Sequence, residues 1–193
     1  MKVIRHFVKP KSVYKEYNED TERILDKAFA LDKQFMKINK MVKDPAEVER
    51  IMLVLRKYYP QMRDQYINLI ANKKSYPVIN WLDYVNSCKT WKIIDRNLSS
   101  QDVDREFIAV NFEEVDLDAN DDKSLCRYEL FELTVRLAKV KFFEKKICAS
   151  ISEATEKLLK EYLIPNTCEE MPWQEFRSEH LWTLEIDDLL KAN

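Results

Sequence analysis

Apolar residues recur at helical spacing along most of the chain. Over residues 19–42 they stand alternately four and three positions apart, the spacing by which one helix packs against another. This stripe consists of Ile24, Ala28, Leu31, Phe35, Ile38 and Val42, and Leu25, Phe29 and Met36 widen it. A stripe of this width predicts a long helix that docks on a globular neighbour.

Two further helices are expected directly after the first. Asp44 is expected to be the N-cap of the second helix, and Pro45 is expected to lie in its first turn. Pro60 predicts either a kink or a separation before a helix over 61–71, because proline lacks the N–H that a helix interior needs. The positions expected to be buried are Val48, Ile51, Leu55, Tyr58, Met62, Tyr66, Leu69 and Ile70.

The middle of the chain predicts two shorter helices. The first starts at Trp81 and is expected to bury that residue together with Leu82 and Val85. The second begins with a capping box, in which Asp102 follows the N-cap residue Ser99 by three positions. Its buried face is either Val103, Phe107 and Val110 or, if the helix continues, Ile108, Phe112 and Val115.

The C-terminal third predicts three more helices. The first, over about 126–145, has an apolar face formed by Leu130, Phe131, Leu133, Val135, Leu137, Val140 and Phe142. Ser150 and Thr183 are N-cap residues for the other two, and Pro165 ends the helix that begins at Ser150. A short turn is expected from Pro172. The last helix, after Thr183, is expected either to dock on the domain or to continue into a longer protein.

Residues 118–129 have the spacing of an EF-hand calcium loop. Such a loop supplies oxygen ligands from positions 1, 3, 5, 7 and 12. The corresponding ligands are the side chains of Asp118, Asn120, Asp122 and Glu129 and the main-chain carbonyl of Ser124, with the apolar Leu125 at position 8. Position 6, where glycine is expected, holds Lys123. A non-glycine residue at positive φ costs about 1–2 kcal/mol, so weak calcium binding is expected.

The surroundings of this loop depart from the usual pattern. Glu114 stands where the incoming helix normally presents an apolar side chain, which predicts that this helix ends early. An upstream segment, 72–83, fits a partner loop if Asp83 is its position 12. Ile79 then takes position 8, where paired EF-hands meet in a short β bridge. Positions 3 and 5 would be Lys74 and Tyr76, which cannot coordinate a hard cation, so this loop is expected to be structural only.

Composition narrows the fold and the location. The chain has 193 residues, of which 46% are hydrophobic, and this composition is typical of a globular protein. Its formal net charge is only −2, so the overall charge does not favour binding to nucleic acid or to an acidic membrane. The sequence contains no glycine, which removes most phosphate-binding loops and disfavours tight hairpins. We therefore predict an all-α fold. No apolar run is long enough for a membrane span or a signal peptide, which predicts a cytoplasmic protein.

Catalytic chemistry is not expected. Only His6 and His180 could serve as imidazole bases, and neither lies in a nucleophile or metal motif. The cysteines at 88, 126, 148 and 168 lack the spacing of a zinc site or a compact disulfide framework. We assign no catalytic residues; an enzyme with a site of scattered acids is the remaining alternative.

Residues 78–145 resemble a divergent EF-hand pair. The segment from Leu125 to Ala138 resembles the outgoing helix of EF-hand proteins of ciliate and flagellate cilia, and the region from Trp173 to Leu190 is similar to a connector in such proteins. The resemblance implies a non-catalytic interaction or structural module. It further implies protein partners in a larger assembly, such as a microtubule-associated ciliary axoneme. A purely structural helical scaffold with a calcium-dead loop is the alternative.

The expected organisation has four parts. They are a basic extended arm over 1–18, an N-terminal helical region over 19–72, an EF-hand-like pair over 73–146 and C-terminal helices over 147–193.

Overall fold

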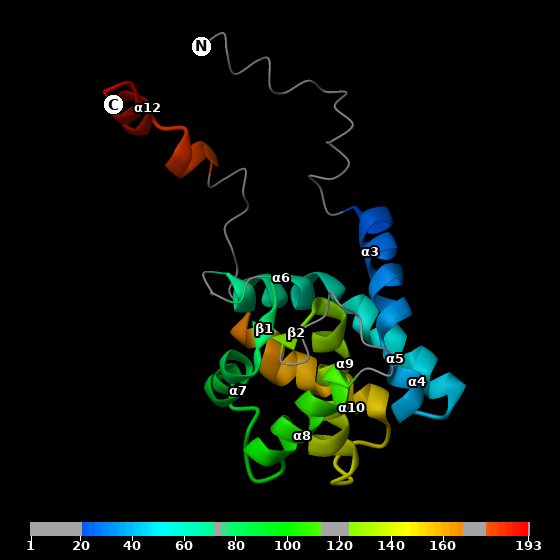
Figure 1. Ribbon diagram of the computed structural model, residues 1–193. Coiled ribbons are helices and arrows are strands. Elements are labelled where there is room, and N and C mark those ends of the chain that lie inside the picture. Colours follow the sequence, from blue (N-terminus) through cyan, green and yellow to red (C-terminus); the bar gives the residue numbers. More distant parts are fainter. Residues whose placement is uncertain (1–20, 72–74, 76, 113–123, 168–176, 193) are drawn as a thin grey trace.

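A computed structural model describes residues 21–71, 75, 77–112, 124–167 and 177–192 (Figure 1). Over these ranges the fold is helical, with a single sheet of two very short strands. The predicted all-α class is confirmed. A membrane-spanning helix is not found among the described residues, where every helix is too short or too polar for one.

The described part of the N-terminal region contains four helices, and one of them starts at its predicted cap, Asp44. They are α3 (Glu22–Phe35), α4 (Ile38–Met41), α5 (Pro45–Lys57) and α6 (Tyr59–Ile70). The carboxylate of Asp44 accepts a hydrogen bond from the backbone N–H of Ala46 at 3.0 Å, which caps α5. Pro60 lies in the first turn of α6, so it separates two helices and does not kink one. The long first helix is interrupted between Phe35 and Ile38.

The buried face of α3 differs from the prediction. Leu31 and Phe35 are 57% and 53% exposed, although both belong to the predicted stripe. The side chains that face the core from α3 and its C-cap are Leu25, Phe29, Asp32 and Met36. This second stripe lies about 100° around the helix from the first. Asp32 favours burial of this second stripe because its carboxylate accepts hydrogen bonds from Tyr59 and Arg127 in the core.

The central region contains the two strands and three helices. They are β1 (Ile79–Asn80), α7 (Trp81–Thr90), α8 (Ser100–Asn111), β2 (Ser124–Leu125) and α9 (Arg127–Ala138). The capping box of Ser99 and Asp102 is present, and α8 buries the first of its two predicted faces. The prediction for α7 was wrong in part, since Trp81 and Leu82 are 44% and 58% exposed. Its core face consists of Tyr84, Val85 and Cys88.

The C-terminal region continues the helical pattern. Its elements are η1 (Lys139–Phe143), α10 (Ile151–Leu158), η2 (Leu159–Leu163), η3 (Ile164–Asn166), η4 (Arg177–Leu181) and α12 (Leu184–Lys191). Ser150 and Thr183 cap α10 and α12 as predicted. The helix that begins at Ser150 continues through η2 into η3, and the last of these contains Pro165. The turn predicted at Pro172 lies outside the described residues.

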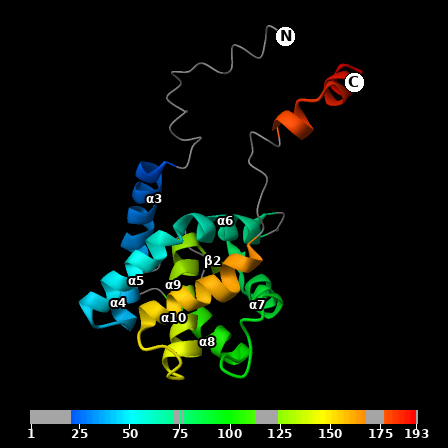
Figure 2. The same cartoon turned by 180° about the vertical axis from the view of Figure 1, so that it is seen from behind.

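One hydrophobic core extends from Leu25 to Leu163 and includes side chains from three of the four predicted parts. Helix α9 supplies many of its members, and α10 packs on both α9 and α5 (Figure 2). Every residue predicted to be buried on α9 and η1 is buried. The predicted arm, residues 1–18, lies outside the described residues. Helix α12 stands apart from this helical body in both views.

Candidate functional site

Strands β1 and β2 bring together two segments that are distant in sequence (Figure 1). They pair antiparallel, with Ile79 opposite Leu125 and Asn80 opposite Ser124. Both apolar members are buried, at 1% and 0% exposed. Ile79 and Leu125 are the residues that the sequence places at position 8 of the two loops. The structure therefore contains the bridge in the register that the loop alignment predicts.

Each strand leads into a helix whose N-terminal hydrogen bonds involve the residue at position 12. On α7, the side-chain oxygen of Asn80 accepts the backbone N–H of Asp83 at 2.9 Å, and its amide donates to the Asp83 carboxylate at 2.9 Å. On α9, Oε2 of Glu129 accepts the backbone N–H of Cys126 at 2.8 Å. Such bonds satisfy N–H groups that a helix start leaves without partners.

Two of the five predicted calcium ligands lie in the described part of the chain. Ser124 is 2% exposed and Glu129 is fully buried. Asp118, Asn120 and Asp122 lie outside the described residues. Bidentate coordination by Glu129 requires both carboxylate oxygens, so the hydrogen bond from Cys126 has to be broken or shared when an ion binds. Among the described residues no group of three His, Cys, Asp or Glu side chains is placed to hold a metal ion. The calcium site stays a prediction.

The approach to the second loop is fixed by a lysine from the N-terminal region. Helix α8 ends at Asn111, and residues 112–117 separate it from loop position 1, so the predicted early end is present. The ammonium of Lys37 donates to the carbonyls of Val110 and Phe112, each at 2.8 Å. A cation at this place satisfies the last carbonyls of the helix and interacts favourably with its dipole.

The same lysine also binds α9. Its backbone N–H donates to Oε2 of Glu132 at 2.7 Å, and Arg136 donates to Oε1 of that carboxylate at 3.0 Å. Glu132 is fully buried, and both of its oxygens have donors. The interruption between α3 and α4 is therefore bound to both helices of the second helix–loop–helix unit.

A second buried carboxylate binds the N-terminus of α9. Asp32 accepts two hydrogen bonds from Arg127, at 2.9 and 3.0 Å, and one from the hydroxyl of Tyr59 at 2.7 Å. Burial and the hydrogen bond to Asp32 raise the pKa of Tyr59 well above its usual value. Burial alone would lower the pKa of Arg127, but the hydrogen bond and charge of Asp32, together with Tyr59 and Tyr66, raise that pKa. Tyr59 and Arg127 therefore keep their protons near neutral pH.

The first loop is attached to its own incoming helix by Tyr66. Its hydroxyl donates to the carbonyl of Pro77. Burial raises the pKa of Tyr66 to about 12, with a smaller contribution from Cys126 across the paired strands. The phenol therefore remains a hydrogen-bond donor at any physiological pH.

A buried lysine positions the turn between α7 and α8. Lys141 is fully buried on η1, and its ammonium contacts the carbonyl of Ile93 at 2.7 Å and the carboxylate of Asp95 at 2.6 Å. The ammonium also lies 4.9 Å from the centre of the Tyr162 ring. Burial alone would raise the pKa of Asp95, but the hydrogen bonds from Lys141 and from two backbone N–H groups, together with the charge of Lys141, lower that pKa.

Sequence reasoning missed Asp32, Glu132 and Lys141. A single charged residue in a helical pattern is normally assigned to the solvent face. The available signal was the local context: Glu132 follows Phe131 directly and Lys141 stands between Val140 and Phe142, in helices whose flanking residues are apolar. Buried charges in such places have partners from other elements, as these three do.

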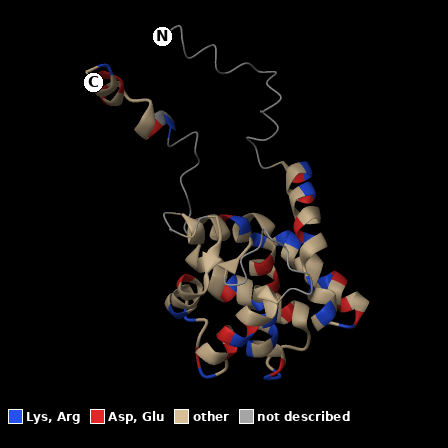
Figure 3. Ribbon diagram, viewed as in Figure 1, with Lys and Arg blue, Asp and Glu red and all other residues tan. Residues whose placement is uncertain are grey.

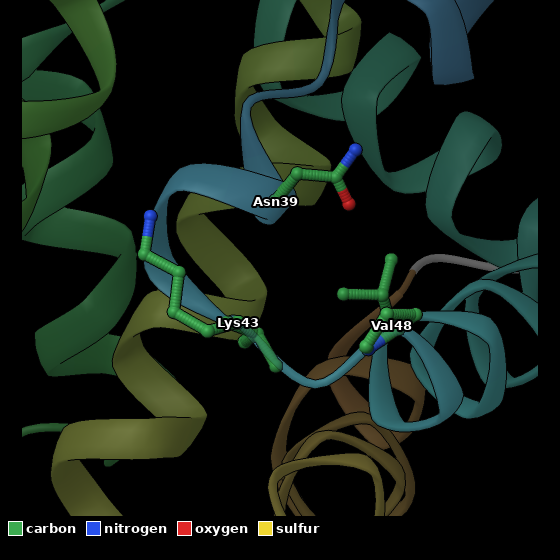
Figure 4. Close-up of a pocket in the computed structure, with 5 residues that line it drawn as sticks. Asn39, Lys43 and Val48 are labelled. Atoms are coloured by element: carbon green, nitrogen blue, oxygen red, sulfur yellow. The ribbon is translucent and has the colours of Figure 1, made fainter.

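A surface pocket of about 310 Å³ lies at the turn between α4 and α5 (Figure 4). Its lining consists of Asn39, Val42, Lys43, Pro45 and Val48. None of these is an acid, a histidine, a cysteine or a hydroxyl residue. The pocket therefore offers no pair of groups for general acid–base or nucleophilic catalysis.

The two positive φ angles of the described residues bear on Lys123. Lys92, just after α7, and Lys146, after η1, both have a φ of 58°. Glycine usually takes this conformation at helix ends, because a Cβ atom disfavours it. The fold thus accepts lysine in the left-handed region at two places. The same conformation at Lys123 would cost about 1–2 kcal/mol and would not by itself prevent a loop of EF-hand shape.

Comparisons with known proteins return no similarity. No protein-family model matches the chain, no curated protein matches it, and no solved structure matches it. The paired loops and the contacts around them are therefore the basis for a proposed function.

Proposed function

We propose that the chain is a non-catalytic EF-hand-type interaction module with a weak calcium site in its second loop. The observation that carries this proposal is the pairing of Ile79 with Leu125. Each of these residues precedes a helix whose cap includes the acid at position 12. Two helix–loop–helix units joined at position 8 are the arrangement in which EF-hands pair. The calcium ligands would be Asp118, Asn120, Asp122, the Ser124 carbonyl and Glu129.

The second candidate is a purely structural helical scaffold with a calcium-dead loop. It is favoured by the cap in which Glu129 already takes part, and by the lysine at position 6 of the loop. In this candidate, the bridge between β1 and β2 only holds four helices in place. Both candidates are compatible with an assembly of several proteins.

Calorimetric titration of the full chain with calcium chloride distinguishes the two candidates. We expect a saturable heat with a dissociation constant of about 10⁻⁴–10⁻³ M, in the range of weak EF-hand sites. Glu129→Gln should abolish this heat, because the amide keeps an oxygen for the N–H of Cys126 but loses the charge and the second calcium contact. The absence of heat at millimolar calcium would leave the scaffold as the better proposal.

The matched control changes the equivalent residue of the first loop. Asp83→Asn alters position 12 of the loop that lacks ligands at positions 3 and 5. It should leave the calcium heat unchanged, while magnesium in place of calcium should give little or none. If Asp83→Asn and Glu129→Gln had the same effect, calcium would not be bound by the second loop in the proposed way.

The fluorescence of Trp81 offers an independent readout. This residue follows β1 directly, and its indole N–H donates to Asp104 on α8 at 2.8 Å. Calcium bound in the second loop would change the environment of the Trp81 indole through the paired strands β1 and β2. In a variant with the other three tryptophans replaced by phenylalanine, calcium should shift its emission, and Glu129→Gln should remove the shift.

The wider part of the proposal is a place in a larger protein assembly, as the resemblance to ciliary EF-hand proteins implies. A microtubule-associated partner can be tested by co-sedimentation of the chain with polymerised tubulin. Recovery in the pellet above that of an inert globular protein would support direct association. Recovery in the pellet equal to that of the inert protein would argue against direct association with microtubules.

A further inference from the structure

The predicted apolar stripe of α3 is present, but it faces outward. Leu31 and Phe35 are 57% and 53% exposed, and Ile24 and Ala28 on the same stripe are half-buried. The ring of Phe35 lies 5.3 Å from that of Tyr128, which extends the stripe toward α9. We call this surface the α3 outer stripe. Its four-and-three spacing is the pattern that fits another helix.

Helix α12 carries a second exposed apolar face. Leu189 and Leu190 are 64% and 70% exposed, and Ile186 lies three and four positions before them on the same side. An isolated helix of eight residues is marginal in water and gains most of its stability from packing. This face is therefore the kind that becomes buried against a partner.

Charged residues occur on both helices, and Figure 3 marks them in blue and red along α3 and α12. Arg23 and Lys27 are exposed along one edge of the α3 outer stripe. The acids of α3 on its other side, Glu22 and Asp26, pair with Arg56 at 2.6 and 2.7 Å. The acids of α12 are Glu185, Asp187 and Asp188, of which Asp187 pairs with Lys191. A basic edge on one face and acidic side chains beside the other favour their association.

We propose that α12 of one copy packs on the α3 outer stripe of a second copy, and that the contact is reciprocal. Both faces are exposed, and no other helix of the described residues covers them. One contact with a helix of this length is small for a stable interface, and a two-fold arrangement doubles the buried area. This dimer does not depend on calcium or on the paired loops.

Sedimentation equilibrium of the full chain over about 1 μM to 1 mM tests the dimer. The wild type should dimerise, and Leu31→Glu and Leu190→Glu should each weaken association by about a hundredfold, because a carboxylate would be buried without a partner. The matched control is Leu53→Glu, which changes a leucine on α5 that is 65% exposed but belongs to neither face. It should dimerise like the wild type. Circular dichroism verifies that all three variants remain folded.

A charge exchange tests the pairing without altering the apolar contact. Lys27→Glu should weaken the dimer by about fivefold, and combining it with Glu185→Lys, at the edge of the α12 apolar face, should restore much of the loss. The nine residues 168–176 can span roughly 30 Å, so the same chain's α12 is the competing occupant. A wild type that stays monomeric overturns the proposal. If hydrogen exchange then shows α12 protected in the wild type and unprotected in Leu31→Glu, the occupant is the same chain's helix.

Discussion

The two helix–loop–helix units, α6–β1–α7 and α8–β2–α9, share a bridge but differ in almost everything around it. In the first unit the incoming helix reaches Ile70, directly before the loop, and in the second it stops at Asn111. Helix α7 buries one face, whereas α9 is buried around most of its surface. The first loop has a regular approach and no ligands; the second has ligand spacing and an irregular approach.

The contrast shows that the residues that pair the two units differ from the residues predicted to bind calcium. The bridge depends on Ile79 and Leu125 and on the caps beside them, none of which requires calcium. The second unit is further fixed from outside by Lys37 and Asp32, which bind α8 and α9. These contacts between protein groups fix the two helices α8 and α9 relative to the N-terminal region.

The largest expected effect follows from the buried carboxylate on α9. Glu132→Ala should lower the free energy of unfolding by about 3–5 kcal/mol, because the N–H of Lys37 and the guanidinium of Arg136 lose their buried acceptor. Asn80→Ala, which removes the N-cap of α7, should cost only about 1 kcal/mol. Urea denaturation of both variants measures the difference. Equal losses would mean that the two units are fixed to the core equally.

The bridge itself should be equally important to both units. Ile79→Ala and Leu125→Ala should each cost about 2–4 kcal/mol, since both side chains are buried and opposite one another. The loss of unfolding free energy in the double variant should be about 1 kcal/mol smaller than the sum of the two single losses, because Ile79 and Leu125 lie opposite one another. Strict additivity in denaturant unfolding would argue against direct coupling of the loops.

The smallest expected effect distinguishes the incoming helices. Helix α6 starts without a side-chain cap, whereas Ser99 and Asp102 cap α8. Ser99→Ala should therefore cost about 1 kcal/mol near neutral pH. The hydrogen bond from the Ser99 hydroxyl is the main cause of the lowered pKa of Asp102.

The pH dependence of this effect follows from the sign of that shift. A lowered pKa means that ionised Asp102 stabilises the fold above its ordinary value of 3.8, and that this stabilisation is lost as the pH falls further through the folded-state pKa. The difference between wild type and Ser99→Ala in thermal unfolding should therefore shrink below pH 3.8. A difference that stays constant down to low pH would show that Asp102 takes no part.

Local signals predicted the helix starts well. Caps at Asp44, Ser99, Ser150 and Thr183 lie within a few residues of the groups they satisfy, so the sequence contains the whole interaction. The register of the bridge was also predictable, because the loop spacing alone assigns position 8. The ligands at 118–122 lie outside the described residues and stay a prediction.

The orientation of α3 and α7 was not predictable in the same way. Helix α3 has two apolar stripes, and the choice between them depends on Asp32 meeting Arg127, a residue distant in sequence. On α7, the indole of Trp81 finds a hydrogen-bond acceptor on α8 and stays 44% exposed. Partners from other elements decided both outcomes, and periodicity within one helix carries no information about them.

The contacts that hold the N-terminal helices have a consequence for the order of folding. Lys37 meets Glu132 and Asp32 meets Arg127 across 95 positions, and Glu47 meets Ser152 across 105. Contacts of such long sequence separation close late, because a large loop has to be ordered first. During synthesis α3 to α5 therefore leave the ribosome before their buried polar partners exist. The N-terminal third is made first and completes its packing last.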